Sequence, residues 1–380
     1  MTFNNIPQIK IGSLEINIIQ GGMGVGISKH RLAAAVANEG GAGIIASVAL
    51  CLPDDYATEI VRRKTSEFDS LSAEHKKILY EEAYILSNQL ALRREIREAR
   101  RKSNGVIGVN IMHALSNYAS LVKTAIEEDI DMIISGAGIP KDLPSYLNGK
   151  NTKLIPIVSS VRLAEMICKS WGRQGHLPDA IIVEGPMAGG HLGYSREELA
   201  NQEFVENGLE RIVTEVVSAI KPFETDRRIP VIAAGGIYYG YDIKKFIDLG
   251  ASGVQMATRF VTTFECDADE KFKQAYIDCK KEDIRIIHSP VGMPGRAISN
   301  EFLERVESGE RSSLNCTYHC LKSCNREEAP YCIAKSLVNA QQGKLLGGFV
   351  FAGLNAYRCK EIVSVKQVME DLDIEYNLRK

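Results

Sequence analysis

The stretch 183–193, VEGPMAGGHLG, places a histidine where it could handle a proton beside a bound ligand. The apolar run 180–183 stops at Glu184, and His191 follows two consecutive glycines. An imidazole titrates near neutral pH, and glycines let a flat ligand approach the backbone closely. The pattern predicts a buried strand that ends in a loop presenting His191 for catalysis. A structural histidine in a glycine turn would have the same spacing, so the other motifs must decide.

Glycine-rich or polar residues also follow other apolar runs. Met23 lies within QGGMGVG, and Asn110 closes GVN, where its amide could offer a donor and an acceptor to a heterocycle. Further on, AAGGI at 233–237 and GASGVQMATRF at 250–260 combine glycines with small residues. These two motifs supply free backbone N–H groups of the kind that hold a phosphate, although plain turns read similarly.

A group of cysteines in the last part of the chain is a second centre of chemistry. The chain has nine cysteines, and four of them, Cys316, Cys320, Cys324 and Cys332, lie close together in the sequence. The first three are spaced four residues apart, so a helix over this segment would present three thiols on one face. Such thiolates could bind an iron-sulfur cluster or zinc. The alternative is that they are small buried side chains packed in a cap.

Composition and charge restrict the class of protein. The 380 residues are 45% hydrophobic, enough for a full core, and 46 basic against 48 acidic side chains leave a net charge of −2. No basic cluster is interleaved with aromatic residues, so no nucleic-acid partner is expected. No apolar run reaches ~18 residues and no secretion signal opens the chain. We therefore expect no membrane span, a cytoplasmic location, and free thiols or metal ligands in place of a disulfide framework.

Short apolar runs alternate with amphipathic stretches between residues 16 and 256. Most runs are apolar throughout, as parallel strands covered on both faces are. Their number and spacing predict an α/β fold, a (β/α)8 TIM barrel, with a doubly wound open sheet as the alternative. The expected strands are 16–19, 42–46, 106–111, 132–135, 154–158, 180–183, 231–234 and 253–256, and the expected helices are 28–39, with Ser28 as its N-cap, 117–128, 161–170, 207–221 and 242–249.

Two segments exceed what a minimal barrel needs. We expect residues 1–265 to form the barrel, with a helical insertion at 52–104 that packs on the barrel or on the second subunit of a homodimer. Residues 266–380 would supply the last barrel helix and a helical cap or substrate region that carries the cysteines.

Together the motifs resemble those of the FMN-dependent nitronate monooxygenases, or 2-nitropropane dioxygenases, and of the related FMN-dependent enoyl-acyl-carrier-protein reductases. The resemblance covers most of residues 10–302 in family order, and it is specific to the superfamily but not to one reaction. The matching pieces are IIQGGMG (18–24), GVN (108–110), SGAGIP (135–140), VEGPMAGGHLG (183–193), IPVIAAGGI (229–237), GASGVQMATRF (250–260) and, more weakly, GMPGRAISNEF (292–302).

The resemblance implies a TIM barrel that holds FMN at the C-terminal ends of its strands, with His191 as the proton-handling residue. The chain departs from the family pattern in its long insertion, in its cysteine cluster and in an alanine at 257, where glycine is frequent; the alanine leaves phosphate binding intact if the backbone N–H is the donor. The implied flavin-binding residues are Gly22 and Met23 at the isoalloxazine ring, Asn110 and Glu184 at flavin or ribityl groups, Gly189 and Gly190 where the backbone approaches the ligand, and Gly235, Gly236, Ala257 and Thr258 at the phosphate.

Several functions fit these residues. The leading hypothesis is an FMN enzyme that oxidises a small carbon acid, such as an alkyl nitronate, with O2, in which His191 takes a proton or balances the charge of the substrate. The runner-up is an NAD(P)H-dependent reductase of an enoyl thioester, followed by NAD(P)H:flavin or quinone reduction. Outside catalysis, the chain could be a flavin and iron-sulfur electron carrier. A barrel that binds another phosphorylated ligand, as nucleotide dehydrogenases do, is also open.

Overall fold

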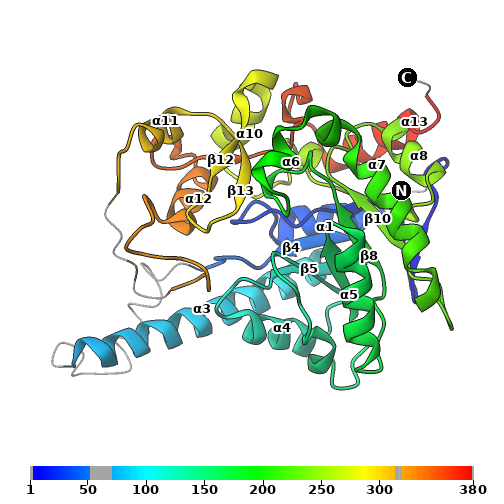
Figure 1. The fold of residues 1–380 in the computed structure, drawn as a ribbon, viewed down its shortest axis with the longest axis horizontal. Helices are drawn as coiled ribbons and strands as arrows, with labels where there is room; N and C mark the ends of the chain where they lie inside the picture. Colours follow the sequence, from blue (N-terminus) through cyan, green and yellow to red (C-terminus); the bar gives the residue numbers. More distant parts are fainter. Residues whose placement is uncertain (1–2, 52–70, 313–315, 317–318, 379–380) are drawn as a thin grey trace.

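The centre of the structure is a parallel β-barrel surrounded by helices (Figure 1). The computed structural model describes residues 3–51, 71–312, 316 and 319–378, and these include an eight-stranded sheet. Its strands, given in their order around the sheet, are β3 (Ile19–Gln20), β11 (Gly253–Met256), β10 (Val231–Ala234), β8 (Ile181–Glu184), β7 (Lys153–Val158), β6 (Met132–Gly136), β5 (Ile107–Met112) and β4 (Gly43–Ala46).

The two outer strands of this sheet meet, which closes the barrel. Ile19 forms a parallel bridge to Ala42, just before β4, and the Gln20 N–H donates to the Ala42 carbonyl at 3.0 Å. The TIM barrel prediction is therefore confirmed, and the open sheet is excluded. All eight expected apolar runs overlap the observed barrel strands, the first of them only at Ile19.

A β-hairpin closes the N-terminal end of the barrel. β1 (Ile9–Ile11) and β2 (Leu14–Ile16) pair antiparallel around Gly12, whose φ of 60° permits the tight turn. Their isoleucines join the inward-facing barrel side chains in one buried cluster. The first residue of β11 is Gly253, and glycine is needed at this position because a Cβ there would overlap the Ile9 side chain. The expected strand 16–19 is thus wrong at its start, since Ile16 ends this hairpin.

Helices cover the outside of the barrel and pack on a second, larger apolar cluster. The last of them, α13 (Val365–Glu375), lies against α8 and α1 and takes the place of the final barrel helix, far along the chain from β11. The N-cap of the first helix is Lys29 and not Ser28, the residue expected from the sequence. The Ser28 hydroxyl instead accepts a hydrogen bond from the Met23 N–H at 2.9 Å and closes the first glycine loop. The other covering helices are α1 (His30–Asn38), α4 (Tyr118–Glu127), α5 (Val161–Gly172), α7 (Gln202–Ala219) and α8 (Gly240–Asp248).

The described part of the insertion is one long helix, α3 (Ala73–Lys102). Its C-terminal half packs against α1 and α4, where Arg93 and Arg97 both pair with Glu128 at 2.7–2.8 Å. Its N-terminal half extends away from the barrel in Figure 1. The helical prediction is confirmed here, and residues 52–70 lie outside the described part of the chain.

A cap covers the C-terminal end of the barrel, at the upper left of Figure 1. Its small antiparallel sheet combines three cap strands with β9 (Gly190–His191), which belongs to the loop after β8. The cap elements are β12 (Ile284–His288), β13 (Pro294–Ile298), β14 (Val350–Phe351), α10 (Glu270–Asp278), α11 (Glu301–Glu307) and α12 (Ile333–Gln341), and the short helices α6 (Arg196–Ala200) and α9 (Thr258–Val261) lie in the loops after β8 and β11.

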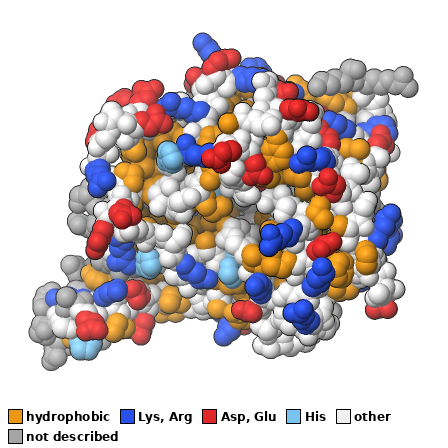
Figure 2. Space-filling view, viewed as in Figure 1, with side chains coloured by type: hydrophobic (Ala, Val, Ile, Leu, Met, Phe, Trp, Pro, Cys, Tyr) orange, Lys and Arg blue, Asp and Glu red, His pale blue; other side chains and the backbone are white. Residues whose placement is uncertain are grey.

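Charges of both signs are interspersed over the face drawn in Figure 2, without a large area of one sign among the described residues. None of the described helices is long and apolar enough to cross a membrane.

Candidate active site

A cavity of about 360 Å³ lies at the C-terminal ends of the barrel strands, under the cap. This volume is within the usual range for small-molecule and cofactor sites. Every residue that the sequence assigned to the flavin or to catalysis lines it, with one exception, Thr258. The assigned residues that line it are Gly22, Met23, Asn110, Glu184, Gly189, Gly190, His191, Gly235, Gly236 and Ala257.

Glycine is required at several points of the wall. A Cβ on Gly22 would overlap Asn110, because the ends of β3 and β5 lie close together. Gly235 and Gly236 have φ angles of 93° and 89°, which side chains rarely adopt, so only glycine turns the chain here without strain. The result is a wall in which backbone groups reach the cavity directly.

His191 is held by the cap. Its strand pairs with β13, and its Nε2 lies 2.7 Å from the Ser289 hydroxyl oxygen. The ring also contacts the edge of Phe351 at a centroid distance of 5.0 Å. Burial lowers the pKa of His191 to about 4, so the imidazole is neutral at physiological pH and can accept a proton.

Arg296 fixes the loop that carries this histidine. The side chain is 3% exposed, and its Nη1 donates to the carbonyls of Pro186 and Ala188 at 2.5 and 2.6 Å. No ion pair to Arg296 occurs among the described residues, and burial lowers its pKa to about 10. The guanidinium therefore leaves a positive charge behind the wall of the cavity.

Two further polar groups lie in the wall. Burial raises the pKa of Glu184 to about 7, so this carboxyl exchanges a proton near neutral pH. Gln255 lines the cavity from β11, and its Oε1 is buried without a hydrogen-bond partner in the described structure. A buried acceptor of this kind calls for a donor, which a bound ligand would supply.

Sequence reasoning missed Ser289 and Gln255 and identified Arg296 only as part of a weak match. The exception among the residues it did assign is Thr258, whose hydroxyl faces Gly353 and does not line the cavity. A serine between two strands carries no signal of its own, and only the pairing of β9 with β13 brings Ser289 to His191.

The cysteine segment lies beside the same cavity but is not helical in its described residues. Its backbone pairs with the loop after β5: the Ser116 N–H donates to Cys320 O at 3.1 Å, and the Lys322 N–H donates to Ala114 O at 3.0 Å. Residues 319–332 therefore do not form the helix that would have presented three thiols on one face.

The four thiols nevertheless lie near one another. Burial and the thiols of Cys332, Cys316 and Cys324 together raise the pKa of Cys320 to about 12, and Cys320 lines the cavity. Within the described residues no group of three or more His, Cys, Asp or Glu side chains is arranged to hold a metal ion. An iron-sulfur cluster at these residues stays a prediction.

The fold and the cavity define an α/β-barrel enzyme that binds its ligand at the C-terminal ends of the strands. Residues 6–375 match the model of the nitronate monooxygenase family, and the chain belongs to that family. It is therefore an FMN-dependent oxidoreductase.

Individual relatives agree with this family. A probable nitronate monooxygenase of Staphylococcus aureus is 30% identical over 78% of this chain and 79% of its own length. A (3aS,4S,5R,7aS)-5-hydroxy-7a-methyl-1-oxo-octahydro-1H-indene-4-carboxyl-CoA dehydrogenase of Mycobacterium tuberculosis is 26% identical over 80% of this chain and 69% of its own. The structure of FabK from Thermotoga maritima superimposes with a TM-score of 0.70 at 28% identity, over 96% of this chain and 94% of that one.

Proposed function

We propose that the protein is a nitronate monooxygenase that oxidises alkyl nitronates with O2. The observation that carries this proposal is the neutral, half-buried His191 in a glycine-lined cavity with a positive charge behind its loop. A nitroalkane is a carbon acid, and its conjugate base is a small anion. The cavity thus offers a base for the acid and an electrostatic environment for the anion.

The cavity fits FMN in its volume, in its exposed backbone and in its unsatisfied acceptor. Gly22 and Met23 would contact the isoalloxazine ring, while Asn110, Glu184 and the orphaned Gln255 oxygen would accept from flavin or ribityl donors. Gly189 and Gly190 would let the backbone approach the ring. Backbone N–H groups of Gly235, Gly236 and Ala257 would hold the phosphate. When bound, FMN supplies the electron acceptor and the reactivity toward O2.

His191 would move the proton. In the tautomer whose Nε2–H donates to Ser289 Oγ, the Nδ1 lone pair is free to accept a proton from the carbon acid. The same ring can hydrogen-bond an anionic nitronate after accepting the proton. Arg296, behind the loop, favours the anion at a distance.

An enoyl-thioester reductase is the second candidate, and the apolar part of the cavity lining favours it. The wall includes apolar side chains that could cover an acyl chain, and one relative is a carboxyl-CoA dehydrogenase by name. This candidate needs NAD(P)H as the reductant. These apolar side chains are Leu115, Leu321, Ile333, Leu337 and Phe351.

The experiment that tests these proposals is an anaerobic titration of the purified, FMN-loaded protein with an alkyl nitronate, NADH or NADPH. The flavin absorbance at about 370 and 450 nm monitors the reduction. Bleaching by an alkyl nitronate and reoxidation by O2, without bleaching by NADH or NADPH, supports the monooxygenase. Bleaching by NADH or NADPH, with reoxidation by an enoyl thioester, supports the reductase instead. Reoxidation by a quinone alone indicates quinone reduction, and binding of FMN without bleaching by any of these compounds indicates an electron carrier.

A further inference from the structure

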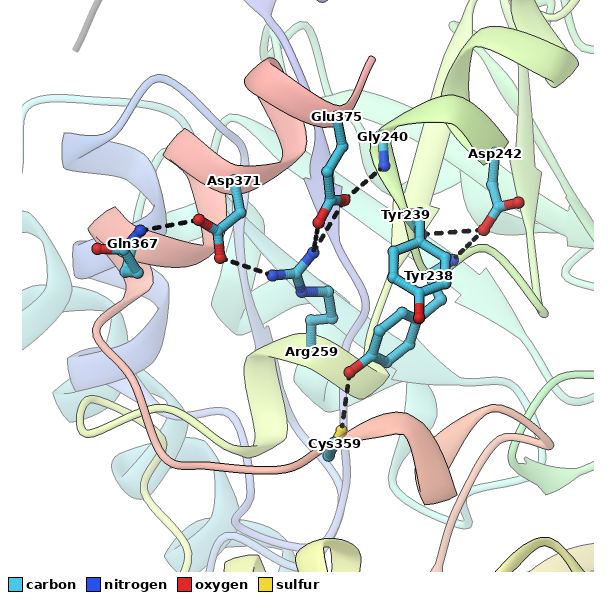
Figure 3. Close-up of polar contacts among 9 residues, drawn as sticks. All are labelled: Tyr238, Tyr239, Gly240, Asp242, Arg259, Cys359, Gln367, Asp371 and Glu375. Atoms are coloured by element: carbon cyan, nitrogen blue, oxygen red, sulfur yellow. Dashed lines mark hydrogen bonds and ion pairs between the residues drawn. The ribbon is translucent and has the colours of Figure 1, made fainter. Parts of the chain in front are cut away.

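Helix α13 places one carboxylate between two loops that line the cavity (Figure 3). The Glu375 carboxylate accepts from the Gly240 N–H at 2.8 Å, and it pairs with Arg259 Nη1 at 3.1–3.2 Å. Gly240 ends the loop that contains Gly235 and Gly236. Arg259 lies two residues after Ala257, in the short helix α9 that follows β11. A residue near the end of the chain thus ties together the two loops that follow neighbouring barrel strands.

Arg259 is fully engaged by this arrangement. Its side chain is 12% exposed, its Nη2 donates to Asp371 at 2.9 Å, and its guanidinium lies 5.4 Å from the centre of the Tyr238 ring. Arg259 does not line the cavity. Two carboxylates on α13 therefore balance its charge, and Figure 3 shows the side chain directed toward that helix. Arg259 therefore lies beside a cavity loop without reaching the cavity, and a role other than direct contact with a ligand is needed to explain its position.

The first loop is fixed in the same place by a second carboxylate. Asp242 Oδ2 accepts from the N–H groups of Tyr238 and Tyr239 at 3.0 and 2.9 Å. The chain from Gly236 to Gly240 is thus held by Asp242 from within its own helix and by Glu375 from α13. Glu375 connects this loop to the loop after β11 through Arg259, and the Tyr238 side chain adds contacts to Arg259 and, through Cys359, to Thr258.

We propose that Arg259 and Glu375 are positioning residues for the flavin phosphate. Backbone N–H groups on two separate loops can hold one phosphate only if the distance between the loops is fixed, and the Arg259–Glu375 pair fixes it. Partly buried ion pairs hold geometry better than exposed ones do, and the two arms of the Arg259 guanidinium reach two carboxylates of α13, Nη1 to Glu375 and Nη2 to Asp371. The inference rests on the proposed placement of the FMN phosphate at Gly235, Gly236 and Ala257.

The test compares FMN with riboflavin, which lacks the phosphate. Dissociation constants of both flavins are measured by fluorescence titration of the flavin-stripped full chain and of its variants. Glu375→Gln is nearly isosteric and can still accept from Gly240, but it loses the charge that pairs with Arg259. We expect the dissociation constant for FMN to rise about tenfold and that for riboflavin to stay within about twofold.

Matched variants separate positioning from general damage to the fold. Glu370→Gln removes a carboxylate of the same helix that pairs with Lys366 at 3.8 Å, and it should leave both constants unchanged. Arg259→Lys keeps the positive charge but loses the two-armed guanidinium, which bonds Glu375 and Asp371 at once. It should therefore reproduce the effect of Glu375→Gln. In the double variant the loss should not exceed that of the worse single variant, because the pair acts as a unit.

The outcomes distinguish this inference from the function on which it rests. The positioning role is overturned if the variants bind FMN and riboflavin more weakly by the same factor. It is also overturned if Arg259→Lys and Glu375→Gln both bind the two flavins as tightly as the wild type does. A wild-type protein that does not prefer FMN to riboflavin overturns the phosphate placement itself, and the inference with it.

Discussion

The Nε2 of His191 lies 2.7 Å from the Oγ of Ser289, a residue 98 positions later in the chain. The Val291 N–H also contacts this oxygen, at 3.4 Å, and Ser289 is only 8% exposed. The serine therefore sits in a fixed position, and its hydroxyl orients the imidazole. Because one ring nitrogen is engaged, the other is left for chemistry in the cavity.

Replacing the imidazole should stop proton transfer without removing the cofactor. In His191→Asn the amide keeps a hydrogen-bonding group but cannot titrate, so turnover of a neutral nitroalkane should fall by about 10²-fold or more while FMN stays bound. The measurements are steady-state rates and the flavin content of the purified protein. The exposed His288 on β12 provides the control, since His288→Asn should keep wild-type rates. Near-normal turnover of every accepted substrate by His191→Asn would remove His191 from the mechanism.

Loss of the serine hydroxyl should have a smaller effect. Ser289→Ala leaves His191 without its orienting partner, and one hydrogen bond of about 1 kcal/mol corresponds to a decrease of about fivefold in kcat. KM should change little if the serine acts through the histidine alone. Ser289→Thr retains the hydroxyl and should restore most of the rate. If Ser289→Ala and Ser289→Thr lose the same activity, the hydroxyl has no role and only the shape of the side chain matters.

Glu184 should make the flavin-free protein less stable as the pH rises. Its pKa in the folded state is about 7, above its ordinary 4.5, so the folded state holds this proton more tightly than the unfolded state does. The resulting stabilisation is complete below about pH 4.5 and is lost as the pH rises through 7, and it amounts to about 3 kcal/mol. His191, with a lowered pKa, acts in the opposite direction between pH 6.5 and 4.

Urea unfolding at pH 5 and pH 8 measures this effect. Glu184→Gln should gain stability relative to wild type at pH 8 and should show little gain at pH 5, because a neutral amide has no proton to lose. A constant difference between the two proteins at both pH values would show that the carboxyl does not titrate in this interval.

The cysteine segment predicts a metal content that chemical analysis can measure. If Cys316, Cys320, Cys324 and Cys332 bind an iron-sulfur cluster, protein purified without oxygen should contain iron and acid-labile sulfide, with a shoulder near about 400 nm that air removes. Cys320→Ser should lose the iron, whereas Cys168→Ser, which changes a buried thiol on α5, should keep it. If protein purified without oxygen contains neither iron nor sulfide, the cluster prediction is wrong and the four cysteines are free thiols of the cap.

The amino-acid sequence by itself determined the barrel and most of the cavity wall. Unbroken apolar runs such as 132–135 and 231–234 can be buried on both faces only in a parallel sheet covered by helices, and the C-terminal ends of such strands meet at one end. Residues at those ends, among them Asn110, Glu184 and Gly235, therefore had to lie close together in the fold.

Only the tertiary structure decided the contacts that cross between distant segments. The cap strand β13 brings Ser289 and Arg296 to the loop of His191, and neither contact has a local pattern in the sequence. The spacing of the cysteines suggested a helix, but hydrogen bonds to the loop at 114–116 took its place. Likewise, α13 fills the last helical position of the barrel because its apolar face fits between α8 and α1. Side-chain periodicity specifies which face of a segment is buried, whereas the partner that buries it is specified only when the whole chain packs.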